Sequence, residues 1–134
     1  MRLWHKDLIP YLPRQQLLGQ WRECCLIAKN IAENGTPNHV LVNKVTDFGD
    51  VEFNNYAHRV FQEMFDRGYH VDPMRFFWHR KNGVVELWED DLFTGWHNDR
   101  YLAQCLANLQ EKYDCGAVPE EDWKKITARW PEWR

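Results

Sequence analysis

A single apolar stripe in the first quarter of the chain constrains the fold more than any other sequence feature. Apolar residues recur there at helical spacing and give residues 13–33 one continuous hydrophobic face. They are Leu17, Leu18, Trp21, Cys24, Cys25, Ala28, Ile31 and Ala32. Pro13 suits the first helical position, and Gly35 tolerates the left-handed cap that ends a helix. So long an amphipathic helix must be covered by other elements of the chain.

Three further segments carry helical stripes that can provide this cover. They are residues 52–67, residues 98–116 and a short run opened by Pro119. Gly83–Trp88 could form a short strand, but no partner strand is evident in the sequence. Three main amphipathic helices and a short C-terminal helix predict an all-α fold, because their stripes must pack on one another.

The composition is typical of one small aromatic-rich globular domain, which we expect to span residues 1–134. Eight Trp, five Tyr and seven Phe can fill a core and leave some rings for binding. No apolar run approaches the ~20 residues of a membrane span, and the start lacks the apolar region of a signal peptide. We therefore expect a cytoplasmic monomer that does not contact membranes and whose four cysteines are reduced thiols.

The charge distribution limits where nucleic acid could bind. The net charge of −3 argues mildly against such binding, because counterion release supplies much of the affinity of basic proteins for DNA. Residues 1–35, however, carry five basic and three acidic groups, a net charge of +2. Residues 71–99 carry three basic and six acidic groups, a net charge of −3. Contacts with phosphates are therefore expected in the first quarter of the chain.

The remaining chemical motifs are weak. The spacing of the six histidines and four cysteines fits no metal-binding pattern, and no glycine-rich phosphate loop is present. We therefore expect neither a metal nor an organic cofactor. The C-terminal residues Trp123, Trp130 and Trp133 could stack on nucleic-acid bases or fold back over the core.

One position on the polar side of the first helix has a possible chemical role. Glu23 lies nearly opposite the centre of the apolar stripe, and Gly19 lies one turn before it. A glycine inside a helix lowers the stability of the helix by about 1 kcal/mol relative to alanine, so such a glycine usually serves packing or function. Gly19 could let another backbone or a ligand approach Glu23. The alternative is a solvated helix face with a tolerated glycine.

The first 25 residues resemble the N-terminus of a known enzyme family. The matching residues are Met1–His5, Leu8–Ile9, Leu12–Gln15, Leu17–Gln20 and Arg22–Glu23, with weaker similarity at 67–69, 98–102 and 130–133. They resemble the pyrimidine-dimer DNA glycosylase/AP lyase family, the dimer-specific endonucleases of phage and their short bacterial relatives. This resemblance implies a compact α-helical fold whose N-terminal segment threads between helices.

The resemblance also implies a DNA-repair mechanism. Enzymes of this family use their N-terminal α-amine to attack C1′ of a damaged nucleotide, which expels the base and leaves an imine; β-elimination then nicks the strand. An α-amine suits this role, because its usual pKa of about 7.7–8.0 leaves part of it neutral at pH 7. Arg2 is bulky enough to prevent removal of Met1, so Met1 would supply the amine. Glu23 matches the family's catalytic glutamate, which stabilises developing positive charge and moves protons.

The expected partner is damaged double-stranded DNA. The resemblance assigns Arg22 and Arg2 to DNA contacts, and Arg14 and Gln15 are further candidates in the same basic segment. Two alternatives stay open at this point. One is a non-catalytic DNA- or protein-binding module on the same fold, and the other is a glycosylase for a different modified base.

Overall fold

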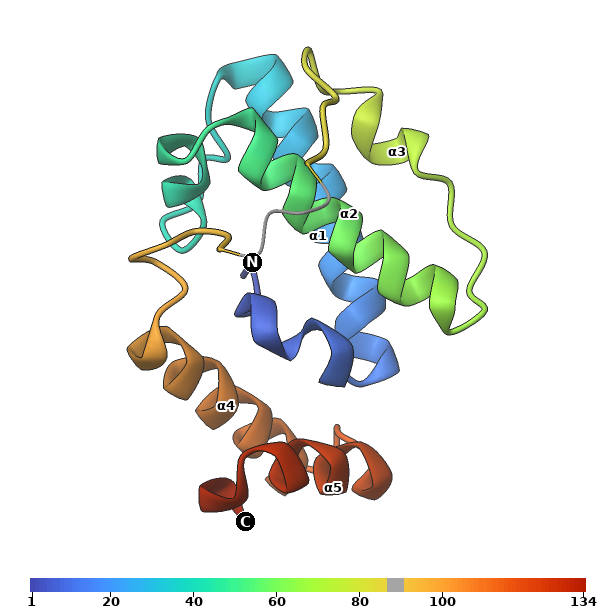
Figure 1. The fold of residues 1–134 in the computed structure, drawn as a ribbon, viewed down its shortest axis with the longest axis vertical. Coiled ribbons are helices and arrows are strands. Elements are labelled where there is room, and N and C mark those ends of the chain that lie inside the picture. The colour runs from blue at the N-terminus through green and yellow to red at the C-terminus, as the bar shows by residue number, and fades with distance from the viewer. Residues whose placement is uncertain (87–90) are drawn as a thin grey trace.

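Helices and irregular segments make up the described part of the protein, residues 1–86 and 91–134 of a computed structural model (Figure 1). The elements are η1 (Lys6–Tyr11), α1 (Arg14–Asn34), η2 (Asn43–Asp47), α2 (Asp50–Asp66), α3 (Met74–Phe77), α4 (Asp99–Asp114), α5 (Glu120–Arg129) and η3 (Pro131–Trp133), where η marks a 3₁₀ helix. The described residues contain no β-strand, so the all-α prediction is confirmed. Residues 83–86 of the possible strand are irregular, and its last two residues lie outside the described ranges.

The four predicted helices are all present, although Pro13 is the N-cap of α1 and not its first helical residue. Pro13 stands one residue before α1, and its carbonyl accepts a hydrogen bond from the Leu17 N–H at 2.9 Å. Gly35 adopts φ +75° just after α1 and donates its N–H to the Ile31 carbonyl at 2.8 Å. The Asn98 side chain caps α4 by accepting a hydrogen bond from the Tyr101 N–H. Local chemistry thus sets where these helices begin and end.

The packing of α1 against α2 and α3 forms one half of the core. The apolar stripe of α1 is buried against the apolar face of α2, where Tyr56 and Val60 are fully buried. Phe76 of α3 closes this layer, with its ring 5.1 Å from that of Phe53 and 6.1 Å from that of Trp21. Each fully buried side chain of this size contributes about 1.5–3 kcal/mol relative to exposure to water.

The N-terminal segment runs through the middle of the molecule. Figure 1 shows residues 1–12 between the α1–α2 pair and the α4–α5 pair, and η1 contacts both α2 and α5. Leu3 and Leu8 are fully buried there. Arg67, at the end of α2, donates hydrogen bonds to the carbonyls of Leu12 at 2.8 Å and Pro10 at 3.2 Å. The expectation of a segment threaded between helices is confirmed.

The tryptophan-rich C-terminus folds back over the core, in agreement with one of the two alternatives. Trp123 and Trp130 are both buried. The Trp123 ring stacks on Tyr113 at 5.0 Å, and the Trp130 ring meets the edge of Tyr11 at 5.2 Å. Trp133 is partly buried against the same core. Trp123 therefore packs α5 against α4 and Trp130 packs the end of α5 against η1, so these two rings are not available for stacking on bases.

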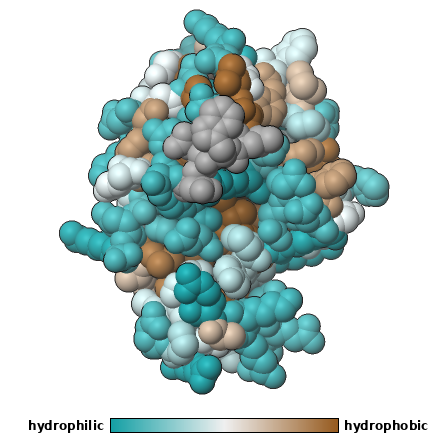
Figure 2. Space-filling view, viewed as in Figure 1, coloured by the Kyte–Doolittle hydropathy of each residue, from teal (hydrophilic) through white to brown (hydrophobic). Residues whose placement is uncertain are grey.

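The outer surface carries mainly polar residues. Figure 2 shows hydrophilic residues over most of this face, with small, separate apolar areas rather than one continuous band. None of the described helices is long and apolar enough to cross a lipid bilayer. The four cysteines are free thiols, of which only Cys115 is exposed.

Candidate active site

Glu23 lies directly against the start of the chain. Its Oε2 accepts a hydrogen bond from the Arg2 N–H at 3.0 Å. This N–H belongs to the first peptide group after the terminal amine of Met1, and both Met1 and Glu23 are half-buried. The fold therefore brings Glu23 to the peptide group that follows Met1, although the two residues are far apart in the sequence. The polar face of α1 is covered here by the chain's own N-terminal segment.

Gln20, one turn before Glu23, pairs with the backbone of the N-terminal segment. Its Nε2 donates to the Arg2 carbonyl at 2.9 Å, and its Oε1 accepts from the Trp4 N–H at 2.7 Å. These are the hydrogen bonds that a neighbouring β-strand would make, here supplied by one amide side chain. Only 1% of Gln20 is exposed. The sequence analysis gives Gln20 no role of its own and so misses these contacts.

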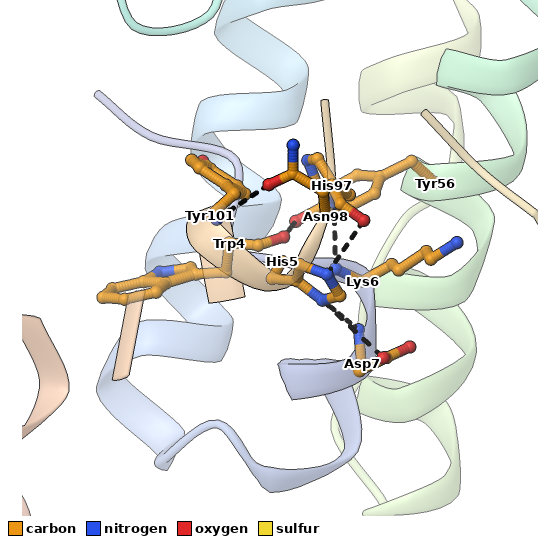
Figure 3. Close-up of polar contacts among 8 residues, drawn as sticks. All are labelled: Trp4, His5, Lys6, Asp7, Tyr56, His97, Asn98 and Tyr101. Carbon is orange, nitrogen blue, oxygen red and sulfur yellow. Dashed lines mark hydrogen bonds and ion pairs between the residues drawn. The ribbon is translucent and has the colours of Figure 1, made fainter. Parts of the chain in front are cut away.

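Two tyrosine hydroxyl groups hold the same segment from other helices, and Figure 3 shows the contact between Tyr56 and Trp4. Tyr101 of α4 donates to the Leu3 carbonyl, and Tyr56 of α2 donates to the Trp4 carbonyl. Tyr56 also lies 3.0 Å from Gln20 Oε1. Burial raises the pKa of both phenols above the usual value, so they remain protonated hydrogen-bond donors. The sequence predicts only that residues 52–67 and 98–116 carry helical stripes, although a buried tyrosine usually finds a partner for its hydroxyl.

A pair of buried histidines fixes the next residues of the segment (Figure 3). His97 Nδ1 accepts from the Lys6 N–H at 3.0 Å, and His5 Nε2 donates to the His97 carbonyl at 3.0 Å. His5 Nδ1 accepts from the Asp7 N–H at 3.1 Å. Each ring thus uses one nitrogen as an acceptor, which requires that nitrogen to be unprotonated. Burial lowers the pKa of His97 to about 2 and also lowers that of His5, so both imidazoles are neutral.

Arg2 directs its side chain toward α4. Its guanidinium lies over the Trp4 ring at 5.5 Å, and Nη1 is 3.8 Å from Cys105 Sγ. Burial is the main cause that raises the pKa of the Cys105 thiol, which therefore accepts this contact as a neutral group. Arg2 is half-buried, so its positive charge stays close to the start of the chain.

The other predicted DNA-contacting residues are exposed along α1. The Arg14 guanidinium lies over the Tyr69 ring at 4.8 Å, and Gln15 is exposed beside it. Arg22 lies eight residues farther along the helix, about 12 Å of axial rise from Arg14. Arg22 therefore lies in the middle of α1, whereas Arg14 and Gln15 lie at its beginning.

Arg22 lines a groove of about 500 Å³ beside α1 and α3. The other lining residues are Cys25, Leu26, Lys29, Asp72, Met74, Arg75, Trp78 and His79. Trp78 is 78% exposed at the end of α3. Three cationic side chains and one open aromatic ring give this groove the chemistry of a nucleic-acid contact. The sequence interpretation missed the groove because α3 is too short to show a periodic pattern.

No other segment of the chain lies close to Gly19, so the approach of another backbone at this position is not found. A Cβ atom added there would meet only the Arg22 side chain, at an ordinary contact distance of 3.9 Å. The N-terminal segment approaches α1 at Gln20 and Glu23 instead, because hydrogen bonding rather than missing side-chain volume brings the two backbones together.

Among residues 1–86 and 91–134, no three His, Cys, Asp or Glu side chains gather in a geometry suited to a metal ion.

Comparison with known families identifies the family of the chain. A family model described as pyrimidine dimer DNA glycosylase matches residues 1–76, which include the N-terminal segment, α1 and α2. No curated protein and no solved structure shows a significant match to the chain. The family match covers more than half of the sequence and contains both Met1 and Glu23. The chain therefore belongs to the pyrimidine dimer DNA glycosylase family, whose general function is DNA repair by base excision.

Proposed function

We propose that this protein is a DNA glycosylase with abasic-site lyase activity, acting on pyrimidine dimers or a related damaged base in double-stranded DNA. The observation that carries the proposal is the hydrogen bond from the Arg2 N–H to Glu23 Oε2. It holds a carboxylate one peptide away from the amine of Met1. An α-amine and a carboxylate are the two groups that imine-forming base excision requires.

The neutral amine of Met1 would attack C1′ of the damaged nucleotide. The new N–C1′ bond replaces the glycosidic bond, whose electron pair leaves with the base, and a proton from the site neutralises that base. Opening of the sugar ring then yields an imine between Met1 and C1′. Positive charge develops on the sugar during this step, and the ionised carboxylate of Glu23 would stabilise it.

Glu23 would then serve as a base in strand cleavage. Removal of a proton from C2′ of the imine pushes electrons toward C3′, and the C3′–O bond breaks so that the phosphate leaves. Water finally hydrolyses the imine and regenerates the free amine. Because Oε2 accepts the Arg2 N–H, Oε1 is the oxygen that would act on the sugar.

The DNA backbone would be held by cations of the groove beside α1 and α3. Arg22, Lys29 and Arg75 line this groove. Arg14 and Gln15 would extend the contact toward the start of the helix, and Arg2 would place its charge near the phosphate next to the reacting sugar. Contacts of this kind orient the duplex, which is needed before a nucleotide can leave the base stack.

Borohydride trapping tests the proposal directly. The protein is incubated with oligonucleotides that contain either a cyclobutane dimer or an abasic site, reduced, and analysed by peptide mapping. We expect a covalent adduct at Met1 with both substrates. An adduct with abasic DNA but not with the dimer would indicate that the enzyme acts on another modified base. Absence of any adduct, with DNA binding retained, would instead favour a non-catalytic binding module.

A further inference from the structure

We infer that Tyr101, Tyr56 and Gln20 are positioning residues for the reaction. They hold the backbone of residues 2–4 and thereby fix the amine of Met1 relative to Glu23. This inference rests on the proposed function, because it takes that amine to be the nucleophile. None of the three side chains needs to touch DNA for this role.

The hydrogen bonds of residues 2–4 come from three separate helices. The Arg2 N–H and carbonyl bind Glu23 and Gln20 of α1, and the Trp4 N–H binds the same Gln20. The Leu3 carbonyl binds Tyr101 of α4. The Trp4 carbonyl binds Tyr56 of α2. Five backbone polar groups in three residues are thus paired with side chains, which is how a segment outside any sheet satisfies its buried backbone.

The terminal amine needs this support because chain ends are usually mobile. The first residues of a domain are poorly ordered unless they are tied down, and catalysis is sensitive to errors of about 1 Å in position. Leu3 and Trp4 are buried, so the paired segment is held along its whole length and not only at Glu23. An amine attached to a fixed segment samples far fewer positions than one at a free end.

Tyr101 comes from a part of the chain that the family match does not include. The match ends at residue 76, whereas Tyr101 lies in the first turn of α4. The Asn98 side chain caps this turn by binding the Tyr101 N–H at 2.9 Å, and the adjacent His97 binds Lys6. These two hydrogen bonds fix the start of α4 and thereby direct the Tyr101 hydroxyl toward Leu3. The second half of the chain in this way completes the geometry of a site whose reacting groups lie in the first half.

Tyr101→Phe provides the test, and Tyr113→Phe provides a matched control on the same helix. Tyr113 donates its hydroxyl to Glu120 Oε2 at 2.6 Å, so the control also removes one hydroxyl hydrogen bond from α4. Single-turnover rates of imine trapping on abasic-site DNA would be measured at saturating protein. Affinity for a non-reactive tetrahydrofuran analogue and hydrogen exchange of the Arg2 and Trp4 amides would be measured in parallel.

We expect Tyr101→Phe to slow imine formation about tenfold or more, as a small displacement of a reacting group does. Its affinity for the analogue should change less than twofold, and exchange at Arg2 and Trp4 should become faster. Tyr113→Phe should leave all three measurements unchanged. A purely structural role would lower the thermal midpoint of Tyr101→Phe without changing its trapping rate at a temperature where it is folded.

The outcomes separate the inference from the proposed function. Equal trapping rates for Tyr101→Phe, Tyr113→Phe and the unaltered protein would overturn the inference and leave the proposed function intact. Failure of the unaltered protein to form any adduct would overturn both. If Tyr101→Phe does not fold, the shape-conserving Tyr56→Phe is measured in the same way, with the same expected loss of rate.

Discussion

His97 accepts a hydrogen bond from the backbone N–H of Lys6 at 3.0 Å, a contact that links the beginning of α4 to the N-terminal segment. The contact exists only while His97 Nδ1 is unprotonated, and His5 stacks on the same ring at 5.2 Å. The two imidazoles therefore form a neutral, buried pair at the centre of the fold.

This pair should make stability depend on pH. Burial lowers the pKa of His97 from 6.5 to about 2, with smaller contributions from the charges of His5 and Lys6. Between these values the unfolded chain binds a proton that the folded chain does not, so unfolding becomes easier as the pH falls below 6.5. We expect the free energy of unfolding in urea to fall by at most about 1.4 kcal/mol per pH unit for each such histidine.

His97→Gln should reduce this pH dependence, because glutamine can still accept the Lys6 N–H but does not titrate. His70→Gln is the control, since His70 is exposed. Urea unfolding at pH 8 and pH 5 would compare the three proteins. A slope in His97→Gln equal to that of the unaltered protein would show that another group causes the dependence.

Removal of the charge on Glu23 should abolish most of the catalytic activity. Glu23→Gln keeps the shape of the side chain and an oxygen that can accept the Arg2 N–H, but it loses the negative charge. Loss of one electrostatic stabiliser typically lowers kcat by about 10²–10³-fold. Single-turnover cleavage of dimer-containing DNA would measure this loss. Glu33→Gln, an exposed change on the same helix, should cleave at the unaltered rate, and equal rates for both variants would contradict the role of Glu23.

Trp78 should contribute to DNA affinity through stacking. Its ring is open to solvent beside the cations of the groove, and stacking of one base on an aromatic ring contributes about 1–3 kcal/mol. Fluorescence anisotropy with a labelled abasic-analogue duplex should therefore show about 5- to 100-fold weaker binding for Trp78→Ala. The control is Phe65→Ala, a 64% exposed ring on α2. If both variants bind alike, the groove does not take part in binding.

Gly19→Ala should stabilise the protein. The added methyl group has room beside Arg22, and alanine favours the interior of a helix by about 0.8–1.0 kcal/mol over glycine. Gly35→Ala should have the opposite effect, because φ +75° disfavours an alanine by about 1–2 kcal/mol. Thermal unfolding would measure both shifts. A destabilising Gly19→Ala would reveal a constraint on α1 other than helix propensity.

Periodicity predicted the long helices well because their stripes are local. The spacing of Leu17, Trp21 and Cys24 alone identifies the buried face of α1. The four residues of α3 and the six of η1 carry no such pattern, since one turn of helix contains too few positions to define a period. Their conformation depends on contacts with α1 and α2.

The site was predicted only in part, for a similar reason. Met1, Glu23 and Arg22 follow from the family resemblance of the first residues, and the fold places Glu23 beside the N-terminal segment. Gln20 is polar on a polar helix face, so nothing local distinguishes it from an exposed glutamine. Its burial arises because the N-terminal segment lies across it, and the contribution of Tyr101 likewise depends on the packing of α4.

The contact between Leu3 and Tyr101 joins residues separated by 98 positions, and this has a consequence for synthesis. A ribosome makes the chain from its N-terminus, so Leu3 emerges into the cell while α4 has yet to be translated. The Leu3 carbonyl therefore lacks its hydrogen-bond donor, Tyr101, until the last third of the chain has been synthesised. A nascent chain therefore lacks this contact until α4 has been made, and shortened products without α4 would keep the N-terminal segment but lose the hydroxyl group that binds Leu3.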